Sequence, residues 1–72
     1  MKFDFFKVLE GITQAVPVLG QAPALISLFE DMIERFDDQD QQMLKDALAI
    51  ARADNDDGHA RLQAKLAEAA KR

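Results

Sequence analysis

Apolar residues recur along the first part of the chain with the spacing of one face of an α-helix. Residues 5–16 show spacings of four, three and four, set by Phe5, Leu9, Ile12 and Val16. Because an α-helix repeats every 3.6 residues, these side chains share one stripe. The sequence contains few β-branched residues and no useful alternation of apolar and polar positions. The pattern therefore predicts helices and no sheet.

Proline and glycine interrupt this pattern after residue 16. Pro17 biases Val16 away from helical backbone, so we expect a break or sharp kink over residues 17–23. Pro23 suits the first turn of a second helix. That helix has a wide apolar face, made of Leu25, Ile26, Leu28, Phe29, Met32, Ile33 and Phe36. An ordinary surface helix buries a stripe about 100° wide, so this helix needs cover on more than one side.

A third helix is predicted to begin near residue 38. Asp38 is followed three residues later by Gln41, in the manner of a capping box. The apolar seam of this helix is narrow and consists of Met43, Leu44, Ala47, Leu48 and Ala51. Its remaining positions are largely polar, which predicts that the side of the helix opposite the seam faces water.

Residues 54–58 have two interpretations. In the first they form a turn: the short polar residues and Gly58 end one helix, and Asp56 or Asp57 caps another that reaches about residue 71. In the second the helix continues, because residues recur in steps of four and three as in a coiled-coil seam. The positions of that seam are Leu44, Leu48, Ala51, Asn55, Gly58, Leu62, Lys65 and Ala69. We favour the turn, since four consecutive poor helix formers and a glycine outweigh a spacing that chance can produce.

These elements predict an all-α fold, a small bundle of three or four helices in a single domain over residues 1–72. Residues 1–36 form an apolar helix, proline bend and second helix, and residues 37–72 form a C-terminal antiparallel helical hairpin. A chain of 72 residues buries only about 60% of the surface that its unfolded form exposes. It has no cysteine for a disulfide, so association with another chain is the expected source of extra stability.

Charge is distributed unevenly around the formal total of −4. The charges of residues 1–29 cancel, ten acidic residues against three basic ones give residues 30–57 a net charge of −7, and the remaining tail carries +3. An acidic middle repels phosphate, so binding to nucleic acid is unlikely.

Neither metal-binding nor catalytic chemistry is indicated. An EF-hand loop with Gly58 at its sixth position would place Ala53 and Ala64 where the two anchoring carboxylates belong. His59 is the only histidine and no cysteine accompanies it, which leaves a zinc site short of ligands. Ser27 and Thr13, the only hydroxyl residues, have no histidine nearby in sequence. We therefore predict no enzyme, no metal and no cofactor.

A membrane-active protein is an alternative that the sequence does not favour. Residues 11–29 carry no charge, and this length approaches the roughly 20 residues that cross a bilayer. Two prolines, two glycines and four polar residues interrupt the segment, which weakens a holin-like or peripheral membrane role. Charged residues from Asp4 to Glu10 also interrupt any signal peptide, so we expect cytoplasmic synthesis.

The candidate site is an apolar interaction surface in the first half, where all five phenylalanines lie. Phe3, Phe5 and Phe6 cannot share one helical stripe, so at least one should point away from the core of its own chain. The predicted surface consists of Phe3, Phe5, Phe6, Leu9, Leu25, Ile26, Leu28, Phe29, Met32, Ile33 and Phe36.

The function predicted from this surface is a non-enzymatic protein–protein interaction or assembly subunit. Its partner would be a further copy, giving a homo-oligomer, or another protein chain. The Ala-rich, cysteine-free composition is typical of small bacteriophage accessory and virion proteins, which suggests a viral setting. A second alternative is an acidic inhibitor that binds a basic partner through Asp31 to Asp57.

Overall fold

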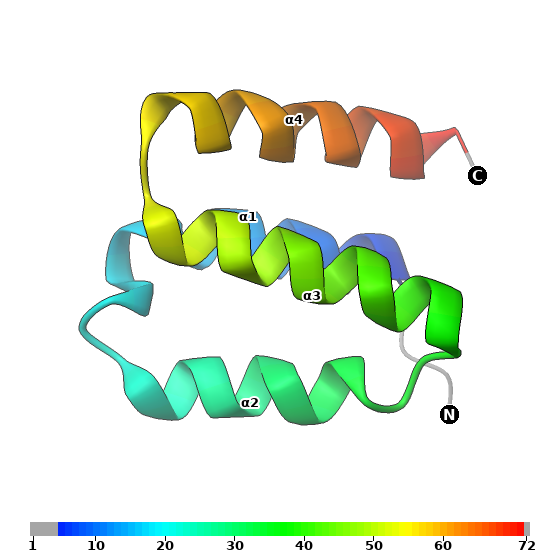
Figure 1. Cartoon of the computed structure of the whole chain (residues 1–72), viewed down its shortest axis with the longest axis horizontal. Coiled ribbons are helices and arrows are strands. Elements are labelled where there is room, and N and C mark those ends of the chain that lie inside the picture. The colour runs from blue at the N-terminus through cyan, green and yellow to red at the C-terminus, as the bar shows by residue number, and fades with distance from the viewer. Residues whose placement is uncertain (1–4, 72) are drawn as a thin grey trace.

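The computed structural model describes residues 5–71 of the chain and confirms an all-α bundle. Four helices make up the described part: α1 (Phe5–Leu19), α2 (Pro23–Ile33), α3 (Asp38–Ala53) and α4 (Asp56–Ala70). Successive helices run in opposite directions (Figure 1), and α3 and α4 form the antiparallel hairpin expected at the C-terminal end.

The bundle is flat, with α1 and α3 at its centre and α2 and α4 on opposite edges (Figure 1). Its extents are 29 × 26 × 16 Å. Helices α1 and α3 each contact the three other helices, whereas α2 and α4 have no contact with each other among residues 5–71. The C-terminal hairpin is therefore not an independent unit, because α1 packs on both of its helices.

The core is apolar throughout the described residues. Five of its side chains have no exposed surface, namely Ile12, Ile33, Leu44, Ala47 and Ala51. No polar or charged residue is buried between residues 5 and 71. The predicted seam of α3 is present, with Ile50 as a further buried residue and Met43 only half-buried. Burial of apolar surface thus accounts for how the four helices are held together.

The break predicted for residues 17–23 lies at residues 20–22, because α1 continues through Pro17 to Leu19 and does not end at Val16. A proline within a helix removes one backbone donor and crowds the preceding turn. Here Pro17 lies in the last turn of α1, so few backbone hydrogen bonds of the helix come after it. Val16 and Leu19, 4% and 1% exposed, gain burial from the additional turn. The chain reverses only beyond it, and Pro23 begins α2 as predicted.

Asp37, not Asp38, caps α3. The carboxylate of Asp37 accepts a hydrogen bond from the backbone N–H of Asp40 at 2.9 Å, and its extended backbone (φ −70°, ψ 169°) is typical of a capping residue. The side chain of Gln41 instead donates to the carbonyl oxygens of Glu34 and Phe36, at 3.1 and 2.9 Å. Gln41 thereby ties the start of α3 to the end of α2.

The turn predicted within residues 54–58 is present at Asp54 and Asn55, but the residues that end α3 and cap α4 differ from those expected. Asp54 ends α3 in the left-handed conformation, with φ 47° and ψ 61°. Asn55, rather than Asp56 or Asp57, caps α4, since its side-chain oxygen accepts from the Gly58 N–H at 2.6 Å. Gly58 does not end a helix and lies buried within the first turn of α4.

The cap assignment can be tested with neighbouring aspartates as matched controls. Asp37→Ala removes the acceptor for the Asp40 N–H and should lower the free energy of unfolding by about 1 kcal/mol. Asp37→Asn keeps an acceptor oxygen and should stay near wild type, while Asp38→Ala should change stability by less than about 0.5 kcal/mol. Urea denaturation followed by circular dichroism measures all three; equal losses for the two alanine variants would refute the assignment.

Candidate interaction surface

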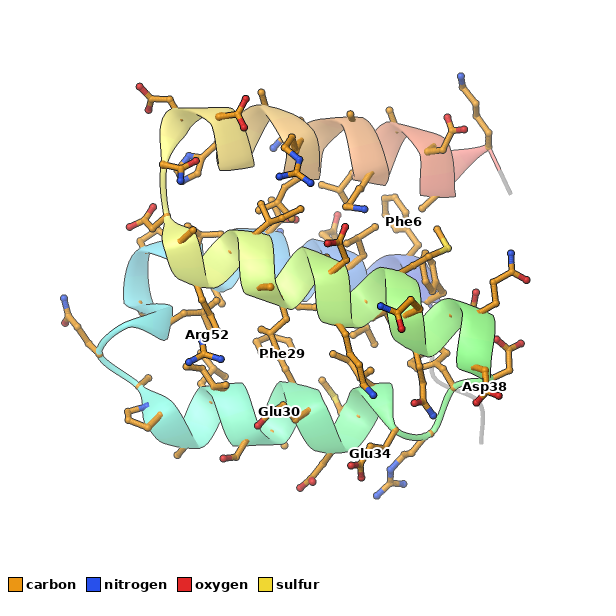
Figure 2. The ribbon with its side chains drawn as sticks, viewed as in Figure 1. Phe6, Phe29, Glu30, Glu34, Asp38 and Arg52 are labelled. Atoms are coloured by element: carbon orange, nitrogen blue, oxygen red, sulfur yellow. The ribbon has the colours of Figure 1, made fainter. Side chains whose placement is uncertain are left out.

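The predicted surface residues divide into three groups by burial, and the first belongs to the core. Leu9, Phe29 and Ile33 are 2%, 6% and 0% exposed. Figure 2 shows Phe29 pointing from α2 toward the centre of the bundle. These three side chains stabilise the fold and offer no surface to a partner of the folded chain.

The second group is half-buried and packs on the outside of the core. It consists of Phe5, Phe6, Leu25, Ile26, Met32 and Phe36. Phe5 and Phe36 meet edge to face, with ring centres 6.2 Å apart and planes at 86°, a preferred aromatic geometry. This contact joins the start of α1 to the segment after α2. Phe6 points toward α4 (Figure 2), and Phe3 lies outside the described residues.

Among the predicted surface residues that the structure describes, Leu28 is the one that is mainly exposed, at 54%. Val18, which is not among the predicted surface residues, is 48% exposed. No other large hydrophobic residue between positions 5 and 71 is exposed. About half of each side chain is left in water and gains no burial energy there, so the two residues are the candidates for contact with a partner.

Helical spacing places these two residues on adjoining stripes of α1 and α2, two helices that pack on each other. On α2, Leu28 follows Leu25 by three positions and precedes Met32 by four; on α1, Val18 ends a stripe with Gly11 and Ala15. We call these six residues the α1–α2 face. The α1 stripe adjoins α2, because a Cβ built at Gly11 lies 3.5 Å from the ring of Phe29. The face therefore spans the junction of two packed helices.

Charge around the α1–α2 face is balanced. Lys7 and Glu10 are the only charged residues of α1, and they have opposite signs. Asp31 and Arg35, three and seven residues after Leu28, also cancel. The acidic residues instead gather at the two connections, residues 34–40 and 54–57. The apolar face is thus a nearly neutral surface on an acidic molecule.

A charged cleft of about 300 Å³ lies between α2 and α3. Glu30 and Glu34 line its α2 wall, Lys45 and Arg52 its α3 wall, and Ile33 forms part of its floor. In Figure 2 the Arg52 side chain extends from α3 toward α2. Because the two walls have opposite charges, the cleft attracts no ion of one sign strongly.

A second cleft, of about 310 Å³, opens between α1, α3 and α4. Phe5, Leu9 and Met43 give it an apolar lining, and Lys65 lies at its edge. The Lys65 ammonium is held by Asp46, with 2.9 Å between Nζ and Oδ2. This ion pair crosses from α4 to α3 and helps to hold the hairpin closed.

The polar residues considered in the sequence are engaged in local structure. Thr13 donates its hydroxyl to the Leu9 carbonyl at 3.0 Å, and His59 contacts the Asp54 carboxylate at 2.8 Å. Ser27 is exposed on α2. Residues 5–71 contain no group of three metal-ligating side chains, and no helix among them is long and apolar enough to cross a membrane.

Neither a family model, nor a curated protein, nor a solved structure matches the chain.

Replacing two glycines by alanine tests the packing, because the two substitutions should change the free energy of unfolding in opposite directions. Gly11→Ala should raise the free energy of unfolding by about 0.5–1 kcal/mol, because the added methyl meets Phe29 at ordinary contact distance and alanine favours a helix. Gly58→Ala should lower it, since the same methyl would lie 3.0 Å from both Ile50 Cγ2 and the Asn55 capping oxygen. Thermal and urea unfolding measure both. Destabilisation by Gly11→Ala would show that α1 and α2 pack more closely than described.

Proposed function

We propose that this protein is a non-enzymatic, self-associating interaction or assembly subunit that meets a second copy through its α1–α2 face. One observation carries the proposal: Val18 and Leu28, the exposed large hydrophobic residues of the described chain, lie on adjoining stripes of packed helices. Half-buried Leu25 and Met32 widen the apolar area around them. Scattered exposed residues need no explanation, whereas a joined apolar patch is typical of an interface.

The distribution of charge favours a second copy as the occupant. In a two-fold symmetric dimer the same patch faces itself, so a patch of one sign would repel its own image. The α1–α2 face is bordered by Lys7 and Glu10 on α1 and by Asp31 and Arg35 beyond Leu28. Because their signs alternate, the face does not repel its own image in a symmetric contact. The acidic connections, by contrast, would repel the same connections of another copy.

The size of the chain also supports association. A domain of 72 residues has a small core, and covering Val18 and Leu28 would add apolar burial that the monomer lacks. The Ala-rich, cysteine-free composition supports a bacteriophage virion or accessory protein as the setting. A virion built from small identical subunits would require contacts between copies of the chain.

The proposal is tested by placing a charge at the centre of the face. Wild-type protein should show a mass above its monomer value of 8.0 kDa by light scattering, rising with concentration. In protein that has not been refolded at high concentration, Leu28→Asp should reduce the mass to that of the monomer, because a buried unpaired carboxylate is strongly unfavourable at an interface. Leu28 is 54% exposed in the single chain, so the variant should retain its helical circular dichroism.

Ala67→Asp is the matched control, since it adds the same charge at an exposed position of α4. It should associate like the wild type. A wild-type protein that stays at 8.0 kDa at millimolar concentration would overturn the proposal, as would equal masses for the two aspartate variants.

A further inference from the structure

The connection between α3 and α4 is short and held in an uncommon backbone conformation. Only Asp54 and Asn55 lie outside the two helices. Asp54, with φ 47°, is the one non-glycine residue of positive φ among residues 5–71. Residues with a Cβ avoid this left-handed region, although aspartate tolerates it better than most. The closed hairpin therefore depends on a strained residue at its turn.

Buried positions on the two helices follow one unbroken helical register across that turn. Steps of four and three connect six of the eight buried residues of the two helices, with Asn55 and Lys65 at the intervening places and Ala47 and Ile50 outside the register. The six are Leu44, Leu48, Ala51, Gly58, Leu62 and Ala69. A closed hairpin does not require this shared register, because its turn lets each helix rotate about its own axis independently of the other. A single straight helix does require it, since only then do all these positions face one side.

Few contacts exist only in the closed turn. They are the bond from the Gly58 N–H to the Asn55 side chain, the His59–Asp54 contact and the close approach of Gly58 to Ile50. The bond from the His59 N–H to the Asn55 carbonyl spans four residues and would persist in a continuous helix. If residues 54 and 55 became helical, the Gly58 N–H would donate a helical hydrogen bond to the Asp54 carbonyl, four residues earlier.

All other contacts of α4 can be made by another copy. Helix α4 packs on α1 and α3 and does not touch α2 within the described chain. An α4 from a second molecule would bury Leu62 against the same core and place Lys65 beside Asp46. A vacated core would expose Leu9 and Leu44, so an opened chain needs a replacement helix of matching shape. The second copy supplies the same side chains.

We infer that two copies of this chain exchange α4: the turn at Asp54 and Asn55 straightens, α3 and α4 join into one helix, and each α4 packs on α1 and α3 of the other copy. Ala51 and Gly58, the small buried residues on either side of the turn, allow the two long helices to cross closely. The exchange does not rest on the proposed contact through the α1–α2 face, because Val18 and Leu28 belong to α1 and α2 and are not part of the turn.

Substitutions at the turn test this exchange. Asp54→Ala with Asn55→Ala removes the cap of α4 and favours a continuous helix, whereas Asp54→Gly relieves the positive φ and favours the closed turn. Both are made with Leu28→Asp, so that association through the α1–α2 face is absent. After refolding at high concentration, the double alanine variant should dimerise roughly tenfold or more strongly than the Leu28→Asp parent. Asp54→Gly should dimerise less than that parent.

An intramolecular distance identifies the exchanged form. Spin labels are attached to Gln42→Cys and Ala67→Cys, exposed sites in a chain with no other cysteine. In the hairpin these labels lie at the same end, since Asp46 and Lys65 are paired. In a continuous helix they lie about 38 Å apart at 1.5 Å per residue, beyond the 29 Å longest extent of the folded chain. Dilution with unlabelled protein restricts the measurement to one chain.

The long distance in the dimer fraction, and its absence from the monomer fraction, is the expected result. A dimer that shows only the short distance would overturn the exchange, as would a double alanine variant that remains monomeric. Should the double alanine variant aggregate, the parent and Asp54→Gly decide the question, because equal populations of the long distance in those two would also overturn it.

Discussion

Close packing of α3 against three neighbours is the constraint on which the rest of this small bundle depends. Ala47 and Ala51 are fully buried, and their small side chains let α3 lie between α1, α2 and α4. Leu44 and Leu48 on either side fill the space that the alanines leave. With only 72 residues, the chain gains a shared core by packing α2 and α4 on opposite sides of the central pair α1 and α3.

The helices themselves could be predicted from apolar spacing, because each buries a stripe on this common core. Their ends could not be predicted as well, since they depend on packing and backbone angles. At Pro17 the local bias against helix was outweighed by the burial of Val16 and Leu19. At Asp37 and Asp38 the side chains are identical, so only the extended backbone of Asp37 decides which one caps α3.

The candidate site could be predicted only in part. The wide apolar face of α2 correctly indicated cover from more than one side, and α1 and α3 provide it. Sequence spacing cannot tell which apolar positions this cover reaches, so Phe29 and Ile33 were assigned to a surface although they lie in the core. Val18 was missed because it lies in the segment expected to break the helix. The interaction role of Leu28 stays a prediction.

The separation of α2 from α4 has a consequence for how the sequence can change. Helices that share no contact affect each other only through the elements between them, here α1 and α3. Free-energy changes from substitutions on the outer sides of α2 and α4 should therefore sum, because distant sites without shared partners behave additively. Substitutions in α2 can accordingly accumulate independently of those in α4, whereas substitutions in α1 and α3 depend on each other.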